Sequence, residues 1–171
     1  MKKSSLIIFL LLIISNEAIA NLYDSPVKLE VISSQIPKMR SIKCKFRQEK
    51  HLQNIAKPLF SSGDFEFIEN KGVYFYTIIP FQSTADYTNK NYKQINDIIS
   101  AISSKKYSRL ETEFDFYYEK NNEKWFLGMK PKKNSNTYNY ISSITINGTD
   151  YINEIEIQQT NGNKTVLWFT K

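Results

Sequence analysis

The sequence predicts a mainly β protein with some α-helix, folded as an incomplete, half-open antiparallel β-barrel covered by an α-helical lid. Most of the chain after residue 40 places apolar side chains at every second position, which is typical of half-buried strands. Two other segments carry apolar residues at helical spacing. A long antiparallel sheet of about eight strands curls rather than staying flat, and two short helices can cover part of its inner side.

The N-terminal residues predict export. Lys2 and Lys3 precede an unbroken apolar run from Leu6 to Ile14, and Ala18-Ile-Ala20 has the small-x-small pattern of a cleavage site. This arrangement is typical of a signal peptide spanning residues 1–20, and the run is too short to span a bilayer comfortably. We therefore expect residues 21–171 to form a single domain in the periplasm.

The composition argues against nucleic-acid binding and against an internal disulfide. The net charge of +6 suits contact with anionic surfaces or acidic partners, but the basic residues are too dispersed to indicate nucleic-acid binding. Cys44 is the single cysteine, so an internal disulfide is excluded. Because Cys44 alternates with Ile42 and Phe46, we expect it to be a buried thiol.

The first half of the chain predicts a helix, three strands and a second helix. Ser25-Pro26 is a good helix start and Pro37 a good end, and strand alternation begins at Ser41. A hairpin turn is expected at residues 70–72. On the strands beside it, Phe65 and Phe67 are expected on the inner face, together with Tyr74, Tyr76 and Ile78. The second helix, within residues 89–103, carries the apolar face Ile95, Ile98, Ile99 and Ile102.

The second half predicts about five strands in hairpin order. Phe114, Phe116 and Tyr118 share one face of the first, and a turn at Asn121-Asn122 leads to a strand with Trp125 and Leu127 inward. Later alternating segments are separated by Asn147-Gly148 and Asn161-Gly162. Asn-Gly pairs tolerate the positive φ of tight hairpin turns, so both are expected to be turn centres.

Residues capable of catalysis are sparse. Cys44 and the single histidine, His51, are seven residues apart and would point to opposite faces of one strand. Glu111, Glu113 and Asp115 would share a strand face, but it is the solvated face opposite Phe114 and Phe116. The sequence lacks the Gly-x-Ser-x-Gly, phosphate-loop and dinucleotide motifs and has no metal-ligand spacing. We therefore expect no enzymatic activity, no cofactor and no metal.

The aromatic and branched inner face has two interpretations. Each residue taken singly is most simply part of the core. Taken together, a curved sheet of about eight strands encloses more volume than two short helices fill, which predicts room for an apolar ligand. The predicted lipid-binding cavity is lined by Phe65, Phe67, Tyr74, Tyr76, Phe114, Phe116, Trp125 and Leu127, with Ile95, Ile98, Ile99 and Ile102 on the lid.

Seven segments, taken in order, resemble the LolA family of periplasmic lipoprotein carriers. They are Met39–Gln48 with its Phe-x-Gln, Lys57–Gly63, Phe65-x-Phe67, Lys71–Tyr76, Trp125–Pro131, Asn153–Ile157 and Thr165–Phe169. The resemblance implies a LolA/LolB-like half-barrel closed by helices. It also implies a monomeric carrier that shields the acyl chains of lipoproteins or related lipidated cargo. Such a carrier receives its cargo from a transient inner-membrane donor and delivers it to an outer-membrane acceptor.

Two departures from the family pattern widen the choice of cargo. Asn70-Lys71-Gly72 stands where lipoprotein carriers typically have Arg-Pro, and the chain ends soon after Phe169 without their C-terminal extension. The sequence is closer to shorter LolA-like proteins, which occur with lipid or aryl-polyene biosynthesis genes. Two alternatives stay open. One is a lipid-sensing or protein-interaction module on the same fold, and the other, less favoured, is an enzyme acting on a lipid.

Overall fold

The computed structural model describes residues 22–86 and 93–171, so the predicted signal peptide, residues 1–20, lies outside the described residues. The helical elements are α2 (Leu29–Gln35), α3 (Lys93–Ser104), α4 (Ser108–Glu113) and the 3-10 helix η2 (Asn136–Asn139). The strands are β1 (Ser41–His51), β2 (Leu59–Ile68), β3 (Gly72–Ile79), β4 (Ser83–Asp86), β5 (Phe114–Asn121), β6 (Lys124–Pro131), β7 (Ile141–Gly148), β8 (Ile152–Gln159) and β9 (Lys164–Thr170).

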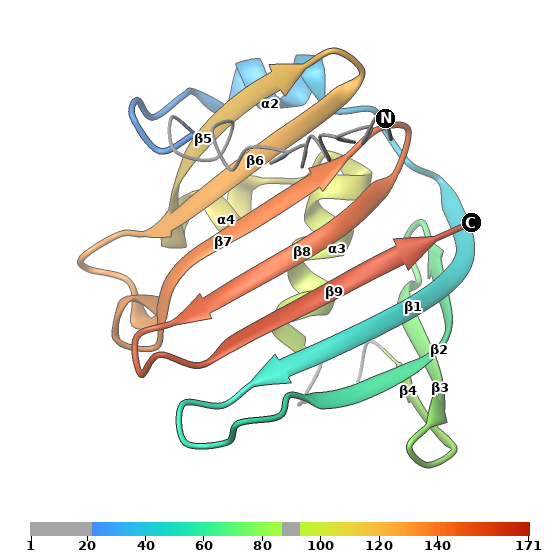
Figure 1. Ribbon diagram of the computed structural model, residues 1–171. Helices are drawn as coiled ribbons and strands as arrows, with labels where there is room; N and C mark the ends of the chain where they lie inside the picture. The colour runs from blue at the N-terminus through green and yellow to red at the C-terminus, as the bar shows by residue number, and fades with distance from the viewer. Residues whose placement is uncertain (1–21, 87–92) are drawn as a thin grey trace, which may run out of the picture.

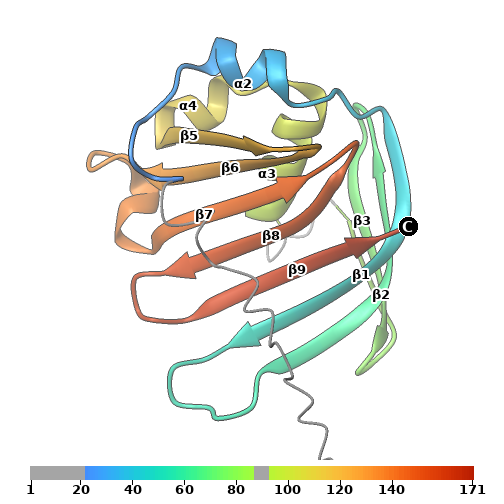
Figure 2. The same cartoon turned by 45° about the horizontal axis from the view of Figure 1, so that its top comes forward.

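The strands form one antiparallel sheet that stays open. Its order is β4-β3-β2-β1-β9-β8-β7-β6-β5, so β4 and β5 are its two edges, and β1 pairs with β9 near the middle. The sheet is strongly curved, and α3 lies on its concave side, while α2 and α4 lie at the β5 end (Figure 1, Figure 2). The prediction of a mainly β protein with an open antiparallel sheet is confirmed.

The first helix is shorter than expected and starts later. Helix α2 begins at Leu29 rather than at Ser25-Pro26, and its N-cap, Lys28, makes no side-chain capping bond. Val27, which precedes the N-cap, explains the later start. Its backbone N–H donates to the carbonyl of Phe116 over 2.7 Å. Residue 27 therefore extends the edge of the sheet at β5 instead of joining the helix. The buried residues Ile32 and Ile36 keep this end against the core.

Strand alternation is confirmed on β1 and β2. Ile42, Phe46 and Gln48 are buried, Cys44 is half-buried, and the intervening basic residues are exposed. The outward positions form ion pairs across the strands, such as Lys43 with Glu66 at 3.1 Å and Lys45 with Asp64. Since these pairs lie on the convex, solvent-exposed face, they contribute little to stability. The apolar inner face therefore fixes which side of the sheet turns inward.

Two predicted turns have different outcomes. Gly162 has a φ of +83° between β8 and β9, which confirms the turn at Asn161-Gly162. Asn147-Gly148 instead belongs to the end of β7, and the chain turns at residues 149–151. Gly148 is needed there for space, because a Cβ atom would lie 2.2 Å from the Tyr151 carbonyl oxygen and 2.4 Å from the Trp125 ring.

Strand β4 and helix α4 were not expected, and neither was the 3-10 helix η2. Strand β4 pairs with β3 at the edge of the sheet, and its sequence, Ser-Thr-Ala-Asp, buries Ala85 alone. Helix α4 includes Glu111 and Glu113, so these residues do not share a strand face with Asp115 as predicted. Glu113 instead accepts a hydrogen bond from the Thr137 hydroxyl over 2.6 Å, which ties α4 to η2.

Candidate functional site

The concave face of the sheet is the candidate site. Strands β2, β5 and β6 direct six of the predicted lining residues onto it, and each of the six is at most 4% exposed: Phe65, Phe67, Phe114, Phe116, Trp125 and Leu127. They belong to one continuous hydrophobic cluster with the buried residues of β7, β8 and β9. Trp125 is fixed by a hydrogen bond, since its indole N–H donates to the Thr149 carbonyl over 2.7 Å.

The placement of Tyr74 and Tyr76 on this face is wrong. Phe65 pairs with Phe75, and Phe67 pairs with Val73. Residues directly opposite each other in an antiparallel pair share a face, so Val73 and Phe75 are the inward residues of β3, and both are fully buried. Tyr76 is 39% exposed on the convex side. Val73 and Phe75 therefore replace the two tyrosines in the apolar surface.

The four predicted isoleucines of α3 cover the concave face. Ile95, Ile98, Ile99 and Ile102 are between 0 and 9% exposed and belong to the same cluster as the sheet residues. Open space beneath the helix was expected, but in the structure the side chains of α3 occupy it. An apolar ligand can therefore reach this face only if α3 moves.

Polar bonds join α3 to its surroundings toward both ends of the helix. At the C-terminal end the Met39 N–H donates to the Ser103 carbonyl over 2.9 Å, and the Lys105 ammonium donates to the Ser33 carbonyl over 2.7 Å. Toward the N-terminal end, the Val73 N–H donates to Asn96 Oδ1 over 3.2 Å. Asp97 also pairs with Arg109 of α4 at 3.3 Å. Within the described residues, α3 thus has polar partners toward both ends and covers the sheet mainly through apolar packing.

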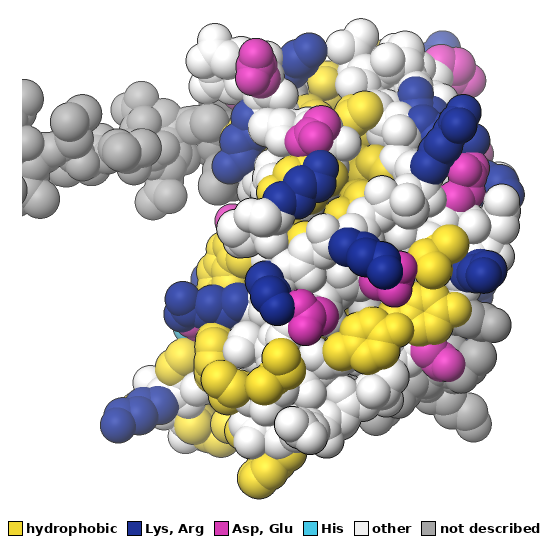
Figure 3. Space-filling model, turned by 90° about the vertical axis from the view of Figure 1, so that its right-hand side faces the viewer, with side chains coloured by type: hydrophobic (Ala, Val, Ile, Leu, Met, Phe, Trp, Pro, Cys, Tyr) yellow, Lys and Arg dark blue, Asp and Glu magenta, His cyan; other side chains and the backbone are white. Residues whose placement is uncertain are grey.

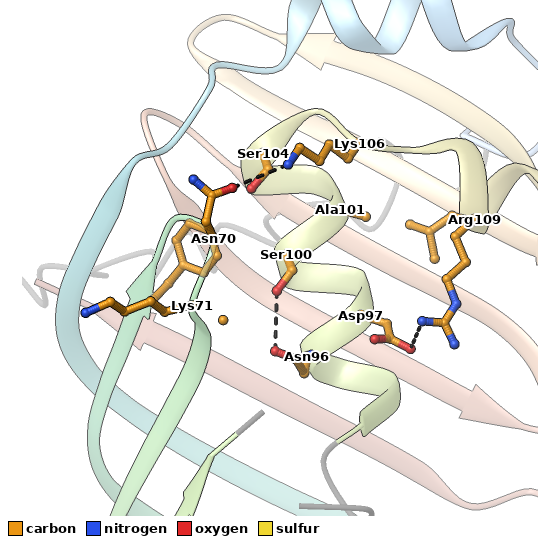
Figure 4. A pocket seen from close by; sticks show the side chains of 12 residues that line it. Asn70, Lys71, Asn96, Asp97, Ser100, Ala101, Ser104, Lys106 and Arg109 are labelled. Carbon is orange, nitrogen blue, oxygen red and sulfur yellow. Dashed lines mark hydrogen bonds and ion pairs between the residues drawn. The ribbon is translucent and has the colours of Figure 1, made fainter. Parts of the chain in front are cut away.

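A groove opens where α3 meets the β2–β3 turn and α4, and we name it the α3 groove. It has a volume of about 370 Å³, and its apolar lining includes Phe67, Ala101 and Leu110. Polar and charged side chains surround it, among them Lys106 beside the turn and Arg109 on α4 (Figure 4). Since Phe67, Ala101 and Leu110 are all members of the buried cluster, this groove is continuous with the concave apolar surface.

Tyr107 is a site residue that the sequence did not reveal. It is buried, and its ring packs against Phe116 with the ring centroids 6.5 Å apart. Its hydroxyl has no hydrogen-bond partner among the described residues. Burial raises the pKa of this phenol to about 12. Tyr107 follows the end of α3 and precedes α4, outside any alternating pattern, so nothing in the local sequence marks it as inward.

A second apolar surface is exposed at the far ends of β2 and β3. Its members are Leu59, Phe60, Ile78, Ile79 and Phe81, and Phe81 is 80% exposed. Figure 3 shows hydrophobic side chains grouped on the lower part of this side of the molecule, with basic side chains beside them. We name these five residues the strand-end patch. Such patches often mark interaction sites, and this one is exposed, whereas the six lining residues of the concave face are buried.

The described residues offer little for catalysis. Cys44 is half-buried, and burial raises the pKa of its thiol to about 11, so the thiol is protonated at neutral pH. His51 lies at the other end of β1, where its Nε2 atom is 3.3 Å from a carboxylate oxygen of Glu49. In residues 22–86 and 93–171, no group of three or more His, Cys, Asp or Glu residues could hold a metal ion.

Comparison with known proteins finds similar solved structures. No protein family model matches the chain, and no curated protein matches it. One matching structure is that of a DUF1329 family protein from Desulfovibrio piger ATCC 29098, with 10% identity, coverage of 90% of this chain and 92% of that one, and a TM-score of 0.40. Another is that of a LolA superfamily protein from Nitrosomonas europaea, with 8% identity, coverage of 85% and 92%, and a TM-score of 0.37.

Across the described parts of the chain, no helix is both long enough and apolar enough to cross a membrane.

Proposed function

We propose that the protein is a non-enzymatic carrier that holds the acyl chains of lipoproteins or related lipidated cargo on the concave face of its sheet. The observation that carries this proposal is the fit between α3 and the sheet. A continuous apolar surface is covered by an amphipathic helix that packs on it mainly through its isoleucine side chains. Such a helix can act as a lid, and the resemblance to the LolA family supports the same function.

The energetics allow cargo and lid to exchange. Burying four isoleucine side chains stabilises the closed state by roughly 6–12 kcal/mol in gross terms, taking about 1.5–3 kcal/mol for each side chain. A 16-carbon acyl chain gains about 12 kcal/mol when it leaves water, at about 0.8 kcal/mol per methylene. Because the two amounts are similar, the net affinity is modest, and cargo can be both bound and released.

Location and partners are part of the same proposal. Cleavage after residue 20 would deliver residues 21–171 to the periplasm as a monomer. There it would take cargo from an inner-membrane donor and pass it to an outer-membrane acceptor. The intact mass of the exported protein tests the first step, and we expect it to correspond to a chain that begins at Asn21.

The carrier function is tested by lipid binding. Delipidated protein is titrated with a fluorescent 16-carbon fatty acid, and Phe67→Glu is compared with Phe60→Glu. Both residues lie on β2, but Phe67 faces the concave side and Phe60 belongs to the exposed strand-end patch. We expect Phe67→Glu to abolish binding and Phe60→Glu to retain it, with circular dichroism checking that both variants fold. A folded Phe67→Glu protein with wild-type affinity would rule out the concave face as the site.

The strand-end patch favours a second candidate, a lipid-sensing or protein-interaction module. An exposed apolar surface of five residues suits a stable partner, whereas a filled concave face needs no cargo. Mass spectrometry of lipid extracted from protein purified from the periplasm separates the two candidates. Stoichiometric acyl lipid supports the carrier, and its absence favours the interaction module.

A further inference from the structure

The α3 groove has the chemistry of a site for a negatively charged group. Three basic residues, Lys71, Lys106 and Arg109, lie along it, together with one acidic residue, Asp97. Asp97 is shared between Lys93 at 2.7 Å and Arg109 at 3.3 Å. Within the described chain, neither Lys71 nor Lys106 forms an ion pair. The groove therefore has positive charge that its own carboxylate does not neutralise.

The backbone around the groove does not oppose an anion. The C-terminal carbonyls of a helix carry partial negative charge and would repel one. Here the Ala101 carbonyl accepts from the Lys106 N–H at 2.8 Å, and the Ile102 carbonyl accepts from the Lys105 N–H at 3.2 Å. The Ser103 carbonyl is taken by Met39, as described above. Three of the last four carbonyls of α3, those of residues 101–103, are thus already bonded.

Lys106 is held in place only weakly. Its ammonium group donates to Asn70 Oδ1 over 3.4 Å, a long bond to a neutral amide at the β2–β3 turn (Figure 4). A phosphate or carboxylate oxygen is a better acceptor for an ammonium group, since charge-assisted hydrogen bonds are about twice as strong as neutral ones. Lys71 is exposed at the same turn, and its amine points away from α3 on a flexible stem that can swing toward a ligand (Figure 4).

The position of the groove beside the buried apolar cluster indicates which kind of anion it suits. Its apolar lining, Phe67, Ala101 and Leu110, leads into the buried cluster beneath α3. A bound molecule could thus place an acyl chain on the concave face and a charged head between Lys106 and the β2–β3 turn. We propose that the cargo is an anionic amphiphile, with an acyl tail and a phosphate or carboxylate head held by Lys71 and Lys106. This inference rests on the proposed carrier function and adds the class of head group.

The test compares three probes on the delipidated chain 21–171 by isothermal titration calorimetry, below the micelle concentration of each lipid. The probes are 1-palmitoyl lysophosphatidic acid, 1-monopalmitoylglycerol with the same tail but no phosphate, and glycerol 3-phosphate with no tail. We expect the phosphorylated lipid to bind about tenfold more tightly than the neutral one at low salt. The difference should shrink at high salt, because the lysines are exposed.

Charge variants assign the preference to the groove. The double variant Lys71→Gln/Lys106→Gln should bind both lipids with the affinity of the neutral one. Its matched control, Lys120→Gln/Lys133→Gln, removes the same charge from exposed lysines on β5 and after β6 and should keep the tenfold preference.

Each contrary result has a separate meaning. Equal affinity of the wild-type protein for the two lipids would overturn the head-group assignment while leaving the carrier function standing. Loss of the preference in the control variant would overturn the assignment to this groove. Glycerol 3-phosphate binding as tightly as the phosphorylated lipid would show a site for free phosphate rather than for an amphiphile. Failure of both lipids to bind would overturn the carrier function and this inference together.

Discussion

Shortening one isoleucine of α3 should tighten the binding of an acyl chain, although it destabilises the protein. The Ile99 side chain lies on the buried side of α3 and is 2% exposed. Replacing such a residue with alanine typically lowers the free energy of unfolding by about 2–5 kcal/mol. In the proposed exchange, this packing exists in the closed state and is lost when cargo displaces the helix. At the lower figure of about 2 kcal/mol, Ile99→Ala should raise the apparent affinity roughly 30-fold.

Ile144→Ala is the matched control, because it makes the same deletion in the sheet. Ile144 is fully buried on β7, paired with Met129 of β6 and with Ile157 of β8. The sheet contacts the helix in the closed state and the acyl chain in the loaded state, so this deletion should weaken chain binding. Fluorescent fatty-acid titration gives the two affinities, and urea unfolding confirms that both variants are folded. If Ile99→Ala also weakens binding, α3 is part of the binding surface and is not displaced.

Three further predictions concern the stability, the thiol and the surface of the protein. Tyr107→Phe removes a buried hydroxyl that has no partner in the described part of the chain, so the free energy of unfolding in urea should rise by about 1 kcal/mol; a fall would mean that the hydroxyl is bonded. The pKa of Cys44 is raised to about 11, so iodoacetamide should modify the folded protein appreciably only as the pH approaches that value. The unfolded chain ionises nearer its ordinary value, so the stability that Cys44 contributes is lost as pH rises from about 9 toward 11; rapid modification of folded protein at pH 8 would contradict this. Phe81→Ser should leave fatty-acid affinity within about twofold, because Phe81 is exposed on the strand-end patch; a large loss would place the bound chain there.

Alternation predicted the sheet well wherever one face of a strand was clearly polar. On β1, basic residues occupy three successive outward positions, Lys43, Lys45 and Arg47, so the inward residues between them follow directly. On β3, both faces carry aromatic or branched residues: Val73 and Phe75 on one, Tyr74 and Tyr76 on the other. The pattern alone cannot choose between them. The pairing of Phe67 with Val73 across the hairpin makes the choice, and this register depends on the shape of the turn.

Features that depend on tertiary contacts could not be predicted from the sequence. Gly148 follows an asparagine, as in a hairpin turn, but its role is to leave space beside the Trp125 ring. Strand β4 has a mostly polar sequence, and it is extended because its backbone pairs with that of β3. The site residue Tyr107 and the α3 groove arise where α3, α4 and the β2–β3 turn meet, and no local pattern brings these segments together.

The two tryptophans provide the most direct measurement of where an acyl chain binds. Trp125 is buried on the concave face, whereas Trp168 of β9 points outward, where its indole N–H donates to Glu154 over 3.1 Å. Trp168→Phe and Trp125→Phe isolate the fluorescence of each ring, and a brominated fatty acid quenches a tryptophan that it touches. Our account predicts that the brominated chain quenches Trp125 and leaves Trp168 unchanged. Saturating binding with quenching of Trp168 alone, or of neither ring, would contradict the claim that the chain replaces α3 on the concave face.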